Sequence, residues 1–164
     1  MSEQSFVEFD SPRFLEITRK VIDDFQDHPK LGMVLQEKGK RGGYVSAGEV
    51  GYGLYFTSLI GFHPVEKPTS FDMAGAKVRY LLDNPNARMS REGRNPPLLW
   101  GGGLRLPGTT FVIGFTGYPE HMDELVVMTI GARLGLLTRD DVTELLTQFP
   151  NDFARPSESN VIFF

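Results

Sequence analysis

The sequence has no cysteine, and this absence excludes several kinds of chemistry. Disulfide bonds, thiolate catalysis and cysteine-ligated zinc or iron–sulfur centres each require a cysteine sulfur. The lack of disulfide chemistry fits a cytoplasmic protein, and the polar residues 2–4 give no sign of a secretory signal. We therefore expect a cytoplasmic location.

Long apolar runs are also missing. No stretch of the sequence approaches the roughly 20 apolar residues that cross a bilayer, so we predict no membrane partner. The formal net charge is −4 at pH 7, and an acidic chain repels a phosphate backbone. The composition therefore favours a protein that does not bind nucleic acid.

Histidine is scarce, and the chain has only His28, His63 and His121. No two of them are spaced like the paired ligands of a metal site, so we predict no metal site. Each could act as an acid–base group near neutral pH, although a surface position is the simpler interpretation for all three. His63 is the best candidate, because its loop lies near the ligand pocket that we predict.

The residues that are present are typical of one globular domain. Of the 164 residues, 40% are apolar and 23% are charged, which suffices for a hydrophobic core. We place a single domain at residues 1–150 and a C-terminal tail at residues 151–164. The apolar residues 161–164 end this tail, and they dock on the domain, bind a partner or fray.

Apolar spacing and turn residues predict an alternation of helices and strands. Apolar residues recur every three or four positions in the predicted helices, and β-branched or aromatic residues alternate or cluster in the predicted strands. The predicted helices are residues 11–27, 69–82, 119–134 and 138–149, and the predicted strands are residues 31–35, 44–45, 52–60, 98–100, 104–106 and 109–116. Short links between the strands predict an antiparallel β-sheet flanked by helices, which is an α+β fold.

Three glycine-containing segments carry a family resemblance. Residues 74–77 read Ala-Gly-Ala-Lys, residues 101–106 read Gly-Gly-Gly-Leu-Arg-Leu, and residues 112–117 read Val-Ile-Gly-Phe-Thr-Gly. In this order they resemble motifs of the haem-binding-protein/GlcG/PduO C-terminal family, which includes HbpS-like proteins. The resemblance implies an α/β/α sandwich that forms homo-oligomers. It also implies that haem or another tetrapyrrole is a conceivable ligand, because some members bind one.

The glycine run and a nearby arginine are candidate ligand-binding residues. The run comprises Gly101, Gly102 and Gly103. Glycines would let a ligand approach the backbone and would offer N–H groups to an anion, whereas a bend or bulge explains them without a ligand. Arg105 follows in a strand and could pair with a carboxylate. We expect the loop arginines Arg91 and Arg94 to be solvated.

Lys77 and Asp123 are candidate reactive groups. Lys77 lies at the edge of the apolar face of its helix, where it either enters a pocket as a cation for a carboxylate or extends to water. Asp123 matches the aspartate of the family motif and could take part in acid–base catalysis. Negative charge at a helix N-terminus explains Asp123, together with Glu120 and Glu124, without any chemistry.

We expect a small-ligand-binding protein of the GlcG/HbpS type. Its pocket would be formed by the Lys77 helix, residues 101–106 and the loop near His63, and it would take a planar or carboxylate-bearing ligand. The alternative is an isomerase, lyase or hydrolase on the same scaffold, in which Lys77, His63 or Asp123 transfers protons.

Overall fold

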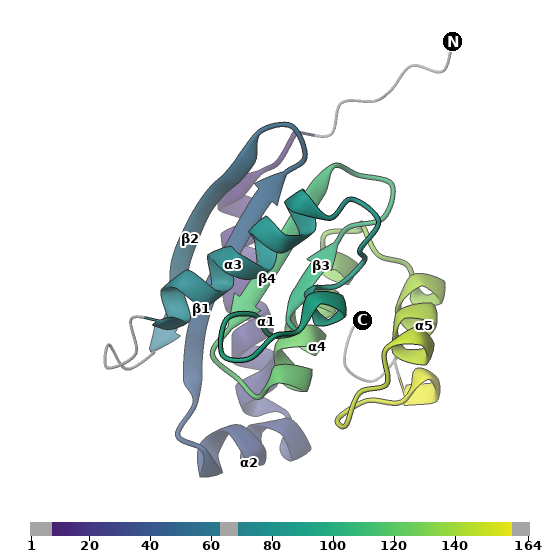
Figure 1. The fold of residues 1–164 in the computed structure, drawn as a ribbon. Coiled ribbons are helices and arrows are strands. Elements are labelled where there is room, and N and C mark those ends of the chain that lie inside the picture. Colours follow the sequence, from purple (N-terminus) through teal and green to yellow (C-terminus); the bar gives the residue numbers. More distant parts are fainter. Residues whose placement is uncertain (1–7, 63–68, 159–164) are drawn as a thin grey trace.

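The computed structural model describes residues 8–62 and 69–158, which form five α-helices and one four-stranded sheet (Figure 1). The helices are α1 (Ser11–Asp27), α2 (Pro29–Glu37), α3 (Thr69–Asp83), α4 (Glu120–Arg133) and α5 (Arg139–Gln148). The strands are β1 (Arg41–Glu49), β2 (Gly53–Phe62), β3 (Gly103–Arg105) and β4 (Phe111–Thr116). Short 3-10 helices lie at Ser90–Gly93 and Pro156–Glu158.

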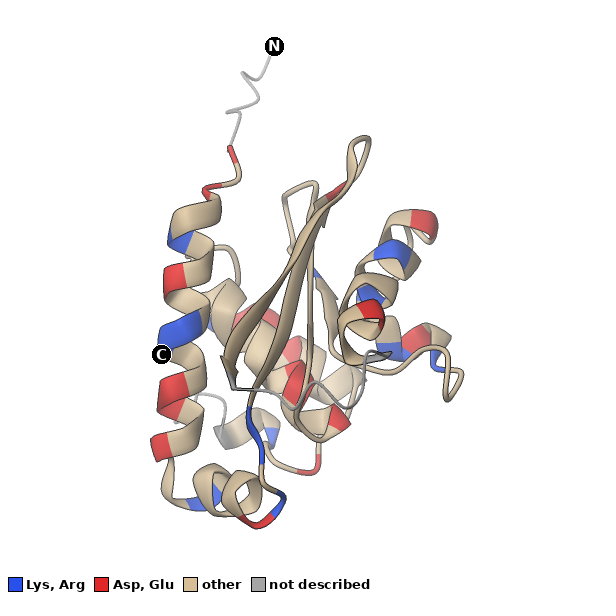
Figure 2. Ribbon diagram, turned by 90° about the vertical axis from the view of Figure 1, so that its left-hand side faces the viewer, with Lys and Arg blue, Asp and Glu red and all other residues tan. Residues whose placement is uncertain are grey.

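The strands follow the order β2-β1-β4-β3, and every neighbouring pair is antiparallel. Helix α3 packs along one face of the sheet, while α1 and α4 contact each other on the opposite face (Figures 1 and 2). The molecule therefore has three layers. This arrangement confirms the predicted α+β fold, in which helices flank an antiparallel sheet.

The residues of β4 explain why both faces of the sheet are covered. Phe111, Ile113 and Phe115 point into the larger core with α1 and α4. Val112 points the other way and packs against Val78 of α3 in a smaller core. Full burial of such a side chain contributes about 1.5–3 kcal/mol, so a strand that is apolar on both faces needs helices on both sides.

Helix α2 occupies the place of the strand predicted at residues 31–35, so that prediction is wrong. Leu31 and Leu35 are four residues apart and share the buried face of the helix, while Met33 lies exposed. An apolar residue at every second position fits one helix turn as well as a strand over so short a stretch. The His28 imidazole begins this helix, because its Nδ1 accepts hydrogen bonds from two N–H groups of the first turn.

The strand predicted at residues 98–100 is also wrong. These residues belong to a turn in which the N–H groups of Leu98 and Leu99 donate to the carbonyl of Asn95. The irregular connection between α3 and β3 therefore runs from residue 84 to residue 102, interrupted by the short 3-10 helix. Loops of this length in compact domains are often functional.

Helix α4 is the most buried helix among the described residues. It begins after Pro119, and Gly135 beyond its end has a φ of +75°, the left-handed conformation with which glycine often ends a helix. Ten of its consecutive residues are buried, and these include Asp123 and Glu124. Acidic side chains at such positions require partners inside the protein.

The last described α-helix is α5, which begins with a capping box between Thr138 and Asp141. Ala154, in the predicted tail, is buried in the larger core. The apolar residues 161–164 lie outside the described residues. Within the described ranges, no helix has both the length and the apolar character that crossing a membrane requires.

Candidate functional site

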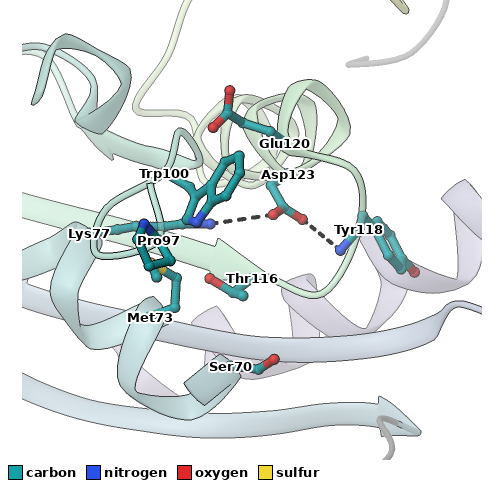
Figure 3. Close-up of a pocket in the computed structure, with 9 residues that line it drawn as sticks. All are labelled: Ser70, Met73, Lys77, Pro97, Trp100, Thr116, Tyr118, Glu120 and Asp123. Atoms are coloured by element: carbon teal, nitrogen blue, oxygen red, sulfur yellow. Dashed lines mark hydrogen bonds and ion pairs between the residues drawn. The ribbon is translucent and has the colours of Figure 1, made fainter. Parts of the chain in front are cut away.

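A pocket of about 500 Å³ lies where the start of α3, the 84–102 loop and the link between β4 and α4 meet. Its lining residues come from all three segments (Figure 3). They are Ser70, Met73 and Lys77 of α3, Pro97 and Trp100 of the loop, and Thr116, Tyr118, Glu120 and Asp123 of β4, the link and α4. The volume suits a small molecule.

Lys77 and Asp123 form a buried pair in this pocket. The Nζ of Lys77 donates to the carbonyl oxygen of Phe115 at 2.6 Å and to Oδ2 of Asp123 at 3.3 Å. The other carboxyl oxygen of Asp123 accepts from the N–H of Tyr118 at 2.9 Å. Lys77 is 1% exposed and Asp123 is 3% exposed, so both groups have left bulk water. Sequence analysis selected both residues, and the structure brings them together.

Burial dominates the acid–base behaviour of the pair. Loss of hydration lowers the pKa of Lys77 below its ordinary value, although the negative charge of Asp123 opposes this effect. Loss of hydration raises the pKa of Asp123 to about 7, and the charge of Lys77 and the Tyr118 N–H limit the rise. Both shifts favour the neutral forms, so the free energies of the charged and neutral pairs lie closer together than in water. The Asp123 carboxyl can therefore gain or lose a proton near neutral pH.

The remaining surface of the pocket combines a free hydroxyl with apolar walls. Oγ1 of Thr116 is buried and has no hydrogen-bond partner among the described residues. Met73, Trp100 and Tyr118 supply apolar surface around it. The Tyr118 hydroxyl is held by the side-chain amide of Gln26 at 2.8 Å, so this ring has a fixed position. An unpaired buried hydroxyl is unfavourable, and a polar group of a ligand would satisfy it.

Two arginines hold the 84–102 loop over α4. Arg91 donates through two nitrogens to Glu124, which is 0% exposed. Arg94 binds both carboxyl oxygens of Glu120 at 2.9 and 3.0 Å, and its guanidinium stacks over Trp100. The expectation of solvation is wrong for Arg91, which is 19% exposed and pairs with the buried Glu124. Arg94 is 44% exposed, as expected of a solvated arginine, although it also pairs with an acid of α4. Glu120 and Glu124 therefore do more than place negative charge at the N-terminus of α4. They also hold the loop that carries Trp100.

The glycine run serves the packing around the pair. The N–H of Gly101 donates to Glu120, and the N–H of Gly103 donates to Oγ of Ser90, so these two groups have internal partners. Gly102 has a φ of +118°, and a Cβ there would lie 2.8 Å from Nζ of Lys77. The structure therefore does not present the predicted anion cradle at Gly101 and Gly103. A bare backbone at position 102 leaves room for the ammonium group instead.

Arg105, predicted to bind ligand, lies away from the pocket. Its guanidinium donates to the carbonyl oxygens of Leu81, Asn84 and Ala87, at and beyond the end of α3. Carbonyls at a helix C-terminus lack intrahelical partners, so a cation there is stabilising. The expectation that Arg105 and Lys77 share a cavity is wrong.

The histidines do not join the described site. His28 caps α2, as above, and His121 accepts from the N–H of Asp152. His63 lies outside the described residues, so its predicted role stays a prediction. The described ranges contain no group of three histidine, aspartate or glutamate side chains that could hold a metal ion.

Haem does not fit the described lining residues well. No histidine is among them, and histidine is the commonest axial ligand of haem proteins that bind oxygen. Haem also carries two carboxylates, whereas the one lining cation, Lys77, already pairs with Asp123. The lining therefore suits a ligand of lower negative charge.

Trp100 and Thr116 were not among the candidate site residues predicted from the sequence. Trp100 is the only tryptophan in the chain and directly precedes the glycine run, which is the signal that could have identified it. Thr116 carries no comparable signal, because threonine is common in strands. No protein-family model matches the chain, and neither a curated protein nor a solved structure matches it. The family resemblance therefore rests on its three motifs.

Proposed function

We propose that this protein binds a small, flat, partly apolar molecule in the pocket, as the resemblance to GlcG/HbpS-like proteins suggests. The observation that carries the proposal is the buried Thr116 hydroxyl, which lacks a partner among the described residues and lies beside apolar walls. Ligand sites commonly combine apolar surface with a few fixed polar groups. A ligand that accepts or donates one hydrogen bond at Thr116 fits this arrangement.

The charged side chains that line the pocket limit the charge that the ligand can carry. Asp123 and Glu120 contribute two carboxyl groups, and Lys77 contributes one ammonium. Lys77 has three protons, of which two are directed to Phe115 and Asp123, so one remains for a ligand oxygen. We therefore favour a neutral or singly charged ligand over a molecule with several carboxylates.

Fluorescence of Trp100 tests this proposal directly, because the only tryptophan of the chain lines the pocket. Titration with small aromatic molecules and with haemin should give a saturable change for at least one flat, weakly charged compound. Thr116→Val keeps the shape of the side chain and removes the hydroxyl, so it should weaken that binding by about 1–2 kcal/mol, or roughly tenfold. A matched control is Thr143→Val on the exposed face of α5, which should leave affinity unchanged. If no compound gives saturation, the proposal is wrong.

An enzyme on the same scaffold is the second candidate, and the Lys77–Asp123 pair favours it. Acid–base catalysts work best when their pKa lies near the working pH, and burial raises the pKa of Asp123 to about 7. An isomerase or lyase acting through this carboxyl would exchange carbon-bound protons of its ligand with solvent. Exchange in D₂O, followed by NMR, should be present with the wild-type protein and absent with Asp123→Asn. Absence of exchange with every compound that binds would remove this candidate.

We also propose a homo-oligomer, as the resemblance implies. Among the described residues, strand β2 pairs only with β1 and no strand lies along its outer edge, and Leu59 on this strand is 48% exposed. Open edges and exposed apolar side chains favour association between chains. Native mass spectrometry tests the oligomer, and Leu59→Lys should reduce its mass, whereas Met33→Lys on α2 should not. A monomer in the wild-type protein would end the proposal.

A further inference from the structure

The amine of Lys77 differs from every other described lysine in its surroundings. It lies inside the pocket and is almost fully buried, whereas the side chain of Lys20, for example, is 70% exposed. Its position is fixed by the carbonyl of Phe115 and the carboxyl of Asp123. Nucleophilic lysines are commonly activated by loss of hydration inside a pocket, and the buried amine of Lys77 has lost its hydration in this way.

The charges around Lys77 do not hold it permanently as an ammonium ion. Three acids of α4 face it, namely Asp123, Glu120 and Glu124. Glu124 is neutralised by Arg91, and Glu120 by Arg94. Asp123 is thus the acid bonded to Lys77, and burial disfavours the charged form of both partners. Transfer of a proton from Lys77 to Asp123 would leave a neutral amine and a neutral carboxylic acid.

Lys77 is one of the residues that line the pocket, so its side chain borders the space open to a ligand. Glycine at position 102 makes room for the amine itself, because a Cβ there would lie 2.8 Å from Nζ. The apolar walls at Met73 and Trp100 would cover the rest of a flat molecule whose polar end reaches Lys77. Thr116 could receive a second polar group of that molecule, because its hydroxyl has no partner among the described residues.

We infer that Lys77 forms an imine with an aldehyde or ketone bound in the pocket. This inference rests on the proposed ligand pocket and names the class of compound that enters it. The lone pair of the neutral amine attacks the carbonyl carbon, and a proton moves from nitrogen to oxygen to give a carbinolamine. Asp123 donates its proton to the leaving hydroxyl, which departs as water. The nitrogen then forms a double bond to carbon and loses its last proton to the Asp123 carboxylate, so that amine and carbonyl give imine and water.

The test uses benzaldehyde as probe, with sodium cyanoborohydride to reduce any imine to a stable benzyl amine. The protein is kept near pH 7 and labelling is followed by peptide mapping. A lowered pKa raises the neutral, nucleophilic fraction of an amine, so Lys77 should be benzylated several-fold faster than Lys20. This comparison is internal to the wild-type protein and needs no variant that folds.

Two variants check the roles of the residues. Lys77→Arg keeps a cation but has no reactive amine, so rapid labelling should disappear. Asp123→Asn makes the Lys77 amine neutral more easily, but it removes the acid that protonates the leaving hydroxyl. Loss of water from the carbinolamine should then limit the reaction, so labelling at position 77 should slow several-fold while labelling of Lys20 is unchanged. Labelling of Lys77 no faster than that of Lys20 in the wild-type protein would overturn the inference.

Benzyl alcohol separates the two possible failures, because it resembles the probe but has no carbonyl. Saturable quenching of Trp100 by benzyl alcohol, without selective labelling by benzaldehyde, would leave the ligand pocket standing and remove the imine. If no compound changes the fluorescence and Lys77 is not labelled, both the pocket proposal and the imine inference are wrong.

Discussion

Replacing Asp123 with asparagine should change how the free energy of unfolding depends on pH. The pKa of Asp123 is raised from 3.8 to about 7 in the folded protein, chiefly because burial removes its hydration. Between about pH 4 and pH 7 the folded protein therefore holds a proton that the unfolded chain has lost. Stability from this group is fully present below pH 4 and falls as the pH rises to 7, because the unfolded state binds fewer protons throughout that range.

The expected size of the effect follows from the shift. One pKa unit corresponds to 1.36 kcal/mol, so a shift of about three units lowers stability by about 4 kcal/mol across the range. Asparagine does not ionise, so the variant lacks this pH-dependent loss of stability. In the variant, Lys77 also loses the carboxylate that raises its pKa, so its amine becomes neutral more easily and stability gains as the pH rises. Both effects make the wild-type protein lose stability relative to Asp123→Asn as the pH increases.

Urea unfolding at several pH values between 4 and 8 measures this difference, and urea adds no ionic strength that would screen the pair. The unfolding free energy of the wild-type protein minus that of Asp123→Asn should decrease steadily up to about pH 7. Asp27→Asn is the matched control, because Asp27 is exposed at the end of α1, and its difference from wild type should change far less. A difference that stays constant, or that grows with pH, would show that Asp123 does not titrate as its burial implies.

Three further predictions concern the residues around the pair. Gly102→Ala should destabilise the protein by about 2–5 kcal/mol, from the positive φ and the contact with Lys77, whereas Gly108→Ala, which has open space, should cost about 1–2 kcal/mol in urea unfolding. Arg105→Lys should lower the unfolding free energy by about 1–3 kcal/mol without altering ligand affinity, and an equal loss of affinity would return Arg105 to the site. Arg94→Ala should make Trp100 more accessible to acrylamide quenching while lowering stability by less than about 1 kcal/mol, since the ion pair with Glu120 is partly exposed.

Helices α1, α3, α4 and α5 and strands β2 and β4 could be predicted from the sequence because their signals are local. The capping box at Thr138, the left-handed glycine at position 135 and the alternation of β4 each depend on a few neighbouring residues. The strand predicted at residues 31–35 was wrong for the same reason, because that prediction also depended on local signals alone. Five residues with alternating apolar side chains fit a strand and a helix equally well, and the deciding feature was the cap supplied by His28.

The site could be predicted only in part, because its contacts join distant segments. Lys77 and Asp123 are separated by 46 positions, and nothing local indicates that they meet. Local reasoning also treated Arg91 as solvated, since a loop arginine usually is, although its partner Glu124 lies buried in a helix 33 residues further on. Arg105 failed in the opposite direction. Its positive charge suggested that it binds a ligand. Its guanidinium instead donates to carbonyl oxygens beyond the end of α3.

The three segments that carry the family resemblance meet at one point in the structure. Lys77 ends the first segment, Gly102 lies in the second, and the Phe115 carbonyl in the third accepts the hydrogen bond from Lys77. One cause thus explains two of these residues. A buried amine packs at the end of β4, which requires a lysine at position 77 and a residue without a side chain at position 102. Most of the pocket lining lies outside these segments, including Met73 and Trp100. Proteins that share the segments would therefore share the buried amine and its supporting backbone, while the walls that select a ligand are free to differ.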